Sequence, residues 1–440
     1  MTTVAAARPW SLRAYAVGMT LATPLLHALL WWRLRRGKES MHSFAQKTMR
    51  SPGAAPQAPV LWGHAVGVGE ARALAGLFRR LAPSLPGVHF LLTTQSVSAQ
   101  AALGPHALPA NSTVQAAPLD TPAAVKRFLD HWQPTLALWC ELDLWPNVVM
   151  TTAERGVPMW LLNARLYPQS MRKRRLGGAL YRHMLPCFAA LYAQNHTTHN
   201  GLLSLGAPTE RTHIGGNLKA LAPPPGADDQ ALRAWTKALA SRPVWLMVSA
   251  HDEDLALAAQ AHQTLLAQHP DALLVVLPRF VQHARNMVQM LTSQGLRATQ
   301  KPRVAPIAAA LAQVQVLLVD AWGEVGLWGR LTTVAAVGGS WSAVGGHNPY
   351  EPLALGCHVL HGPNVHNFAE DYAALATLPT CHPAHDAAAL ARAVASVWDT
   401  TGSRPGASAT PFTPEAAQAM LADLQTAAVS ATRSAAPHPA

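Results

Sequence analysis

Short apolar runs alternate with longer helical segments along most of this chain, and this alternation limits the folds that it can adopt. The runs lie at residues 60–62, 89–94, 136–140, 158–162, 244–248, 273–277, 314–319 and 334–337. Buried strands of a parallel sheet read as continuous apolar runs, because helices cover both faces of such a sheet. The 440 residues leave room for two domains, and the pattern predicts an α/β protein with parallel sheets.

Proline- and glycine-rich stretches divide the chain. Residues 51–59 are predicted to form a linker, and the run Pro-Pro-Pro-Gly at 223–226 is predicted to separate the two domains. From residue 401 the composition turns to Gly, Ser, Pro and Ala, with one predicted helix at about 414–428. We therefore expect an N-terminal segment at 1–50, domains at 51–222 and 223–400, and a tail at 401–440.

The N-terminal segment contains an almost wholly apolar stretch at residues 14–32, and four of residues 33–38 are basic. A membrane-spanning helix needs about 20 residues, so this stretch is near the minimum. We expect it to cross a bilayer, or to lie in the interface with Trp31 and Trp32 at headgroup level. The alternative is an ordinary helix packed on the first domain. The basic flank favours a cytoplasmic location for the following chain.

The net charge of +11, from 34 basic and 23 acidic residues, indicates an acidic partner such as an anionic lipid, a phosphate-bearing sugar or nucleic acid. No recognised nucleic-acid-binding motif accompanies the charge. The four cysteines are scattered without a C-x-x-C pair, and the 21 histidines show no H-E-x-x-H spacing. The sequence therefore predicts free thiols and no metal site.

A glycine-rich segment follows the apolar run at 334–337. Gly-Gly pairs flank residues 340–344, and Asn348, Pro349 and Glu351 fit the N-cap, the first position and the capping box of a helix that ends before Gly356. Such a strand, loop and helix can bind an anion, because the first N–H groups of a helix lack partners. The alternative is a tight turn without a ligand.

Acidic residues follow two apolar runs in the first half. Glu70 ends H-A-V-G-V-G-E and begins a predicted helix at 71–81, where the helix dipole favours a carboxylate. It could act as a general base at a sugar site, or it could simply stabilise the first turn. Glu141 and Asp143 lie in E-L-D-L-W-P-N, where they could order a site or Glu141 could cap a turn. The basic run at 171–175 could be a solvated helix face or could meet lipid phosphates.

Taken together, these motifs resemble those of the 3-deoxy-manno-octulosonic acid (Kdo) transferases of lipopolysaccharide synthesis. The resemblance rests on H-A-V-G-V-G-E at 64–70, E-L-D-L-W-P-N at 141–147, N-A-R-L at 163–166, G-N-L-K at 216–219 and G-G-H-N-P-Y-E-P at 345–352. The motifs occur in the family's order over most of the chain. The chain departs from the family pattern at Gly67, Asp143, Ala250, Phe280 and Trp322.

The resemblance implies a GT-B glycosyltransferase, an α/β fold of two Rossmann-like domains with a cleft between them, preceded by a membrane-associated helix. It implies transfer of Kdo from CMP-Kdo to a lipid A precursor (lipid IVA), with inversion at the sugar carbon and without a metal or cofactor. The enzyme would act at the inner membrane, with its catalytic domains on the cytoplasmic side against an anionic membrane surface. Two alternatives stay open: another nucleotide-sugar enzyme of this fold, such as an epimerase, and an inactive membrane scaffold.

The resemblance also implies roles for individual residues. Glu70 corresponds to the catalytic base. The acceptor side is expected to include Gly67, Gly69, Glu141, Asp143, Asn163 and Arg165. The nucleotide is expected to contact Ser249, His251, Pro278, Arg279, Trp322, Gly323, Glu324, Gly346, His347, Asn348, Pro349, Tyr350 and Glu351.

Overall fold

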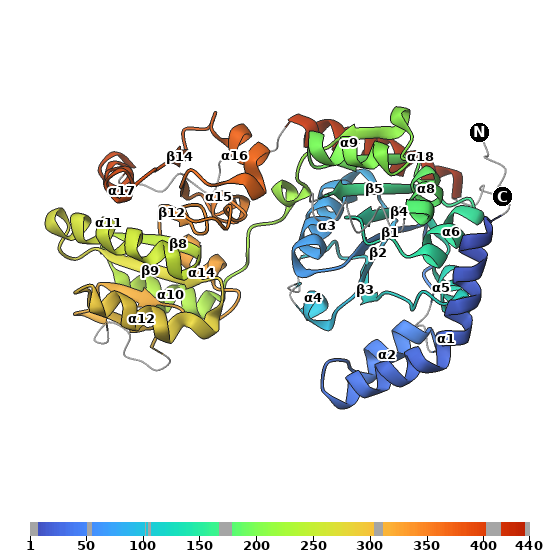
Figure 1. The fold of residues 1–440 in the computed structure, drawn as a ribbon, viewed down its shortest axis with the longest axis horizontal. Helices are drawn as coiled ribbons and strands as arrows, with labels where there is room; N and C mark the ends of the chain where they lie inside the picture. The colour runs from blue at the N-terminus through green and yellow to red at the C-terminus, as the bar shows by residue number, and fades with distance from the viewer. Residues whose placement is uncertain are drawn as a thin grey trace. The chain divides into compact units, whose positions relative to one another are not determined.

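The structure is a computed structural model that describes residues 8–50, 55–101, 103, 107–166, 178–302, 311–401 and 415–435. The chain divides into two compact units: Met1–Pro223 together with Thr413–Ala440, and Pro224–Phe412. Each unit contains a seven-stranded sheet covered by helices (Figure 1). The prediction of a GT-B α/β fold with two Rossmann-like domains is confirmed.

All strand pairs of the first sheet are parallel, in the order β3-β2-β1-β4-β5-β6-β7. The strands are β1 (Val60–Ala65), β2 (His89–Thr94), β3 (Ser112–Ala116), β4 (Pro134–Cys140), β5 (Met159–Ala164), β6 (Ala190–Ala193) and β7 (Thr212–Ile214). The chain builds outward from β1 to β3 and then places β4 on the other side of β1. The boundary between β1 and β4 is therefore the topological switch point of this sheet.

Helices bury apolar side chains on both faces of the first sheet. On one face Leu74 and Phe78 of α3 (Val68–Leu81) pack with Leu218 and Leu221, which belong to a 3₁₀ turn at Leu218–Leu221. The other core contains side chains from α5 (Pro122–Trp132), α6 (Pro146–Glu154), α8 (Gly178–Met184) and α9 (His196–Ser204). A short helix, α4 (Val97–Ala101), follows β2.

Helix α18 (Glu415–Ala435) completes the first unit, although it follows the second unit in the sequence. Met420, Leu424 and Ala428 are buried in the same core as α3. The hydroxyl of Tyr192 donates a hydrogen bond to Asp423 at 2.8 Å. The helix predicted within a low-complexity tail is thus longer than expected and forms part of a domain core. The apolar residues of α18 do not by themselves identify which domain core they join. That assignment requires the structure.

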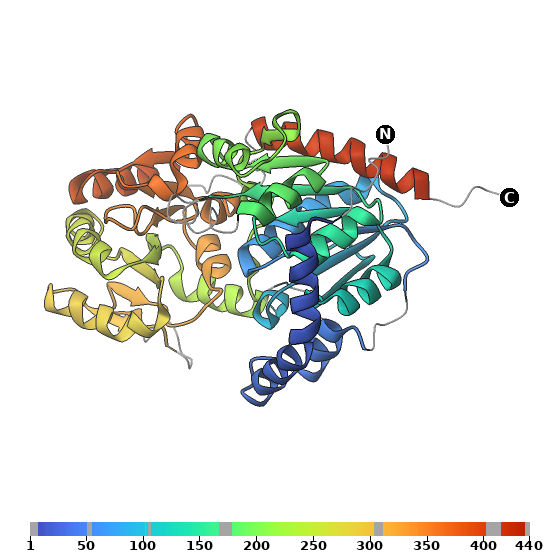
Figure 2. The ribbon, with the colours of Figure 1, turned by 45° about the vertical axis from the view of Figure 1, so that its right-hand side comes forward.

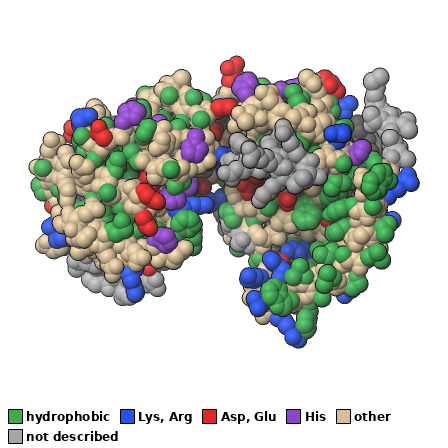
Figure 3. Space-filling model, viewed as in Figure 1, with side chains coloured by type: hydrophobic (Ala, Val, Ile, Leu, Met, Phe, Trp, Pro, Cys, Tyr) green, Lys and Arg blue, Asp and Glu red, His purple; other side chains and the backbone are tan. Residues whose placement is uncertain are grey.

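Helix α1 (Trp10–Arg35) lies against α5 and α6 of the first unit (Figure 2). Leu12 is buried in the core, and the hydroxyl of Tyr15 donates to Asp120 at 2.8 Å. Among the described residues, α1 is the one helix long and apolar enough to cross a membrane. Hydrophobic side chains nevertheless stay exposed along its outer face, beside basic side chains (Figure 3): they are Val17, Leu21, Leu25, Leu29, Trp31 and Trp32.

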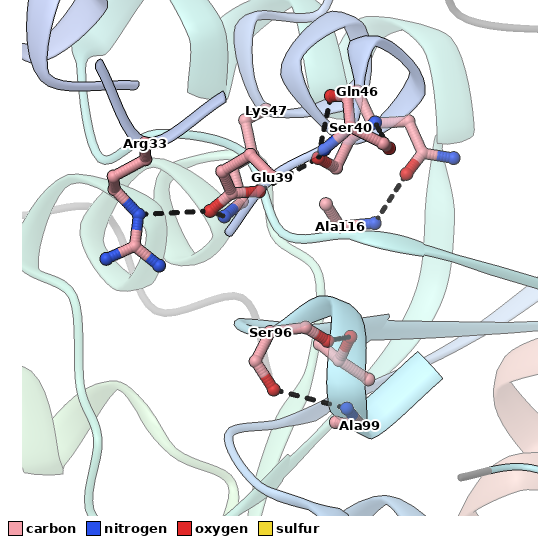
Figure 4. A network of polar contacts seen from close by, with 10 residues as sticks. Arg33, Glu39, Ser40, Gln46, Lys47, Ser96, Ala99 and Ala116 are labelled. Carbon is pink, nitrogen blue, oxygen red and sulfur yellow. Dashed lines mark hydrogen bonds and ion pairs between the residues drawn. The ribbon is translucent and has the colours of Figure 1, made fainter. Parts of the chain in front are cut away.

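A buried carboxylate holds α1 to the next helix, α2 (Met41–Thr48) (Figure 4). Glu39 accepts hydrogen bonds from Lys47 at 2.6 Å, from Arg33 at 3.3 Å and from Ser43 at 2.8 Å. A buried charge needs such partners, because an unpaired one is strongly destabilising. Burial acts in the opposite direction, but the bonds from Lys47 and Ser43 hold the pKa of Glu39 below its usual value.

The second sheet is also wholly parallel, in the order β10-β11-β9-β8-β12-β13-β14. Its strands are β8 (Val244–Ala250), β9 (Leu273–Pro278), β10 (Ala298–Gln300), β11 (Val316–Leu318), β12 (Val334–Val337), β13 (His358–His361) and β14 (Cys381–Pro383). Its helices are α10 (Asp229–Leu239), α11 (Leu255–Gln268), α12 (Ala284–Ser293), α14 (Val325–Arg330), α15 (Tyr350–Ala354), α16 (Ala369–Leu375) and α17 (Ala387–Thr401). The switch point of this sheet lies between β8 and β12.

The start of α15 differs from the sequence prediction. The helix begins at Tyr350 and has 5 residues, and its N-cap is Pro349, which makes no side-chain capping bond, instead of Asn348. Asn348 still accepts a hydrogen bond from the N–H of Tyr350 at 3.1 Å, as a short Asx turn. Gly356 follows the helix with a φ of 79°, which supports its predicted role as a helix stop.

Candidate active site

Two loops of the first unit meet at the switch point of its sheet. Glu70 lies in the segment after β1, and Glu141 is the first residue after β4. Since β1 and β4 are parallel neighbours, both residues lie at the carboxyl edge of the sheet. Open α/β sheets bind their ligands at this edge and at this point.

Glu70 is the third residue of α3, and its position explains a departure from the family pattern. Oε2 of Glu70 accepts a hydrogen bond from the N–H of Gly67 at 3.1 Å. A Cβ atom at Gly67 would lie 2.6 Å from this oxygen, so a serine would force the carboxylate to move. Oε1 lies 3.9 Å from Nζ of Lys219, and the two side chains are 16% and 20% exposed. The carboxylate of Glu70 therefore lies near the ammonium group of Lys219 and in the first turn of α3, and both favour its negative charge.

Glu141 lies beside Glu70 in a backbone conformation that is rare for its residue type. Its φ is 69°, and its N–H donates to the carbonyl of Leu162 at 2.9 Å. Burial and then the nearby carboxylate of Glu70, to which Glu141 is hydrogen-bonded, raise the pKa of Glu141 to about 7. Lys219 and Arg165 oppose this shift. Two adjacent carboxyl groups cannot both ionise cheaply, so one proton is retained on the pair near neutral pH.

Asn163 connects the end of β5 to the G-N-L-K segment. Its φ is 57° and it is 1% exposed. Oδ1 accepts from the N–H of Leu218 at 2.8 Å, and this bond positions the backbone next to Lys219. Lys219 is absent from the site residues predicted from the sequence, although the G-N-L-K motif that contains it could have identified it.

The remaining acceptor-side residues occupy supporting positions. The carboxylate of Asp143 accepts a hydrogen bond from Nε1 of Trp145 at 3.0 Å, which fixes it within its own loop. A Cβ atom at Gly69 would lie 3.3 Å from Cε of Lys219, so a small residue keeps the lysine close. Arg165 acts on Glu141 through its charge. The basic run at 171–175 lies outside the described residues.

In the second unit, a pair of histidines joins the loops at the switch point. His251 follows β8 and His347 follows β12, and their Nε2 atoms are 2.7 Å apart. The two rings are nearly parallel, with an angle of 2° between them. Burial, and then the charges of His251 and Arg279, lower the pKa of His347 to about 4. His347 is therefore neutral at physiological pH and can share one proton with His251.

Asp254 holds the same two loops together through backbone groups. Its Oδ2 atom accepts from the N–H of His251 at 2.9 Å and from the N–H of Gly339 at 2.7 Å. The loops pass very close, because a Cβ atom at Gly338 would lie 2.5 Å from the carbonyl oxygen of Ser249. Ser249 itself has a φ of 56°, so the end of β8 is strained.

The glycine loop uses several of its own N–H groups. Gly345 and Gly346 donate to the carbonyl of Gly339 at 3.0 and 2.8 Å. Gly345 has a φ of 91°, and any Cβ atom there would lie 2.3 Å from the ring of His366. The anion-binding capacity expected here is thus reduced, since these N–H groups are directed inward.

The other predicted nucleotide residues follow β9, β11 and β12. Arg279 is exposed, and Phe280 after it packs edge to face against His251 with ring centroids 5.9 Å apart. Trp322 is 64% exposed, and its neighbour Glu324 accepts two bonds from Lys301 at 2.7 Å. The structure therefore brings Arg279, His251 and His347 together.

Four further residues were predicted from the sequence to contact the nucleotide. Pro278 ends β9, and Gly323 has a φ of 81°. The hydroxyl of Tyr350 donates to Asp371 at 2.7 Å, and Glu351 lies in the first turn of α15.

Within the described parts of the chain, no group of three His, Cys, Asp or Glu residues is arranged to hold a metal ion. Both sites instead consist of paired titratable groups, two carboxyls in the first unit and two imidazoles in the second. Such pairs separate the protonation states of their members, which is the arrangement that acid–base chemistry requires.

Solved structures of low sequence identity share the fold. A UDP-GlcNAc 2-epimerase from Methanocaldococcus jannaschii has a TM-score of 0.53 and 11% identity, covering 83% of this chain and 99% of its own. A putative UDP-N-acetylglucosamine 2-epimerase from Listeria monocytogenes has a TM-score of 0.51 and 13% identity, covering 84% and 96%. At these identities the similarity establishes the architecture and not the reaction.

Sequence comparisons identify the family. Residues 38–222 match the family model of 3-deoxy-D-manno-octulosonic-acid transferase (kdotransferase). A probable mitochondrial 3-deoxy-D-manno-octulosonic acid transferase of Arabidopsis thaliana is 28% identical, over 81% of this chain and 80% of that protein. The 3-deoxy-D-manno-octulosonic acid transferase of Bordetella pertussis is 31% identical, over 81% of this chain and 84% of that protein. The chain therefore belongs to the 3-deoxy-D-manno-octulosonic acid transferase family.

Proposed function

We propose that this protein transfers Kdo from CMP-Kdo to the lipid A precursor lipid IVA, with inversion and without a bound metal, and that Glu70 is the general base. The observation that supports this most directly is the carboxyl pair at the switch point of the first sheet. Glu141 has a raised pKa, and Glu70 has Lys219 at 3.9 Å and the N–H of Gly67 as partners. In this proposal Glu141 carries the proton that the pair retains, and Glu70 accepts the proton of the acceptor hydroxyl.

In this reaction a hydroxyl oxygen of the acceptor attacks the anomeric carbon of Kdo. The bond from that carbon to the phosphate oxygen of CMP breaks, and its electron pair leaves with CMP. The hydroxyl proton passes to Glu70, so the attacking oxygen carries no positive charge. General-base assistance of this kind typically contributes about 100- to 10,000-fold to the rate.

The second unit would bind the donor. Arg279 can make a charge-assisted contact to the phosphate of CMP or a polar contact to the base. The neutral His347 and its partner His251 offer hydrogen bonds without adding a full charge. An epimerase would use the same fold but would not account for membership of the transferase family. The transfer assay described below distinguishes an active transferase from an inactive scaffold.

The first prediction concerns the base. Glu70→Gln keeps the size of the side chain and removes the proton acceptor, so Kdo transfer should fall at least about 100-fold while CMP-Kdo binding and the melting temperature stay close to wild type. Transfer would be measured with radiolabelled CMP-Kdo and lipid IVA. Glu210→Gln is the matched control, since Glu210 lies on the surface 3.8 Å from its neighbour Arg211. Retention of most of the transfer rate in Glu70→Gln would move the assignment to Glu141.

The second prediction concerns pH. The pKa of Glu141 is raised from its reference value of 4.5 to about 7, so its contribution to stability is complete below pH 4.5 and is lost as pH rises through 7. One pKa unit corresponds to about 1.4 kcal/mol, so between pH 5 and pH 8 wild type should lose on the order of 2 to 3 kcal/mol relative to Glu141→Gln. Chemical denaturation of both proteins at the two pH values tests this. If the difference in unfolding free energy between wild type and Glu141→Gln is the same at pH 5 and pH 8, Glu141 is already ionised at pH 5.

The third prediction concerns the donor. Arg279→Ala should weaken CMP binding, measured by calorimetry, by roughly tenfold or more, because it removes one charge-assisted contact. The side chain is exposed, so the melting temperature should change little. Lys237→Ala, on the exposed face of α10, is the matched control. Equal CMP affinity in wild type and Arg279→Ala would exclude this contact.

The fourth prediction concerns the membrane. The exposed stripe of α1, with Arg35 and Arg36 stacked on Trp31 and Trp32, fits an anionic bilayer interface on the cytoplasmic side. Wild-type protein should sediment with phosphatidylglycerol vesicles. Burying one leucine contributes about 1.5 to 3 kcal/mol, so Leu21→Asp should weaken this binding at least about tenfold.

The control for the membrane experiment is Thr426→Asp, which adds the same charge at an exposed position of α18. It should bind vesicles as wild type does. If Leu21→Asp and wild type sediment equally, α1 is not the membrane contact.

A further inference from the structure

One buried carboxylate, that of Asp120, joins α1 to the acidic loop of the first unit. Asp120 is 3% exposed and lies between β3 and α5. Its Oδ2 atom accepts from the hydroxyl of Tyr15 at 2.8 Å and from the N–H of Asn147 at 3.2 Å. Its Oδ1 atom accepts from the N–H of Val148 at 2.8 Å. The same carboxylate is therefore bonded to α1 and to the first turn of α6.

The first turn of α6 directly follows the acidic loop, residues 141–145. The loop begins at Glu141, whose N–H is bonded to the carbonyl of Leu162 at 2.9 Å. Within it, Asp143 accepts from Trp145 through its carboxylate at 3.0 Å and from Trp139 through its carbonyl at 3.2 Å. The loop is therefore tied to β5 at the Glu141 end, and it leads at its other end into the turn that is bonded to Asp120.

The α1–α2 hairpin also holds the chain just before Asp120. The N–H of Ala116 donates to the side chain of Gln46 at 2.8 Å (Figure 4). The N–H of Leu119 donates to the carbonyl of Lys47 at 2.9 Å. A displacement of the hairpin therefore reaches the segment that contains Asp120 through these two hydrogen bonds and the bond from Tyr15.

A lipid surface would displace the hairpin by binding the outer face of α1. The exposed side chains of Val17, Leu21, Leu25 and Leu29 repeat every four residues and so form one stripe, on the helix that carries Tyr15. A lipid surface that takes up this stripe would fix the rotation of α1 about its axis. The rotation of α1 sets where the Tyr15 hydroxyl points.

We propose that Asp120 is a positioning residue that, through Tyr15, couples the seating of α1 on a lipid surface to the placement of the acidic loop and of Glu141. The catalytic consequence rests on the function proposed above, whereas the coupling itself does not. On a lipid surface the hydrogen bonds that the Asp120 carboxylate accepts from Tyr15, Asn147 and Val148 are broken less often. Glu141 is then held beside Glu70. The protein is then most active where its lipid acceptor is found.

The test is amide hydrogen exchange at Asn147 and Val148 in the full chain, with and without phosphatidylglycerol vesicles. In wild type the vesicles should slow exchange at these two amides about fivefold or more. Tyr15→Phe removes one hydroxyl, keeps the exposed stripe and should bind the vesicles as before, but the slowing should disappear. Phosphatidylcholine vesicles, which lack the negative charge, should have little effect on either protein.

Arg8→Met is the matched control. Arg8 lies two residues before α1 and donates to Thr151 at 2.8 Å and to Glu154 at 2.7 Å, near the other end of α6. This variant loosens the contact with α6 and removes a nearby charge, but it leaves the three hydrogen bonds to the Asp120 carboxylate in place, so it should keep the vesicle effect. Three results would each overturn the coupling: no slowing in wild type, equal slowing in Tyr15→Phe, or faster exchange on vesicles, which would mean that α1 leaves the body.

A transfer assay separates this proposal from the proposed function. With lipid IVA in the vesicles and rates expressed per folded enzyme, counted by the stoichiometry of CMP binding, Tyr15→Phe should lower kcat about fivefold or more and leave the KM for CMP-Kdo unchanged. The normalisation is needed because a loss of folded protein would itself lower the apparent kcat without changing KM. Should wild type catalyse no transfer, the proposed function fails, and the exchange experiment still decides whether Asp120 couples α1 to the loop. Wild-type kcat in Tyr15→Phe would contradict the catalytic part of the coupling.

Discussion

The parallel pairing of every strand in both sheets is the constraint on which the rest of the structure depends. In a parallel sheet all carboxyl ends lie at one edge, so each loop that follows a strand arrives on the same side. The switch point then selects two of those loops in each unit: those after β1 and β4 in the first, and those after β8 and β12 in the second. Glu141, His251 and His347 lie in three of these loops, and Glu70 lies in the first turn of α3, directly after the loop that follows β1.

Burial of paired ionisable groups gives the two sites opposite electrostatic character. In the first unit burial and the neighbouring carboxylate of Glu70 raise the pKa of Glu141. In the second unit His347 stays neutral because it is buried beside His251 and near Arg279. Burial thus raises the pKa of an acid in the first unit and lowers the pKa of a base in the second, because it disfavours the charged form of each group.

Strained backbone marks both sites. Glu141, Asn163 and Ser249 are non-glycine residues with φ between 56° and 69°, and each lies at or just after the carboxyl end of a strand. Such conformations cost free energy and persist where surrounding bonds over-determine them. Here those bonds are visible, as in the pairing of Asn163 with Leu218. The side-chain direction that each conformation imposes is what brings Glu141 toward Glu70 and Asn163 toward the segment of Lys219.

The sequence by itself determined the α/β class, the central strands, a helix that ends at Leu81 and the family, because apolar runs and local motifs are properties of neighbouring residues. It started that helix at Ala71, whereas the helix begins at Val68 and contains Glu70 in its first turn. It did not reveal the short edge strands β10 and β14, because partly exposed three-residue strands lack an apolar run. The start of α15 was misplaced, since Asn348 fits both an N-cap and an Asx turn. Lys219 beside Glu70, Tyr15 on Asp120 and α18 in the first core were decided by the tertiary structure alone. Each of these contacts joins residues that are distant in the chain, and only the order of strands in the folded sheet places them together.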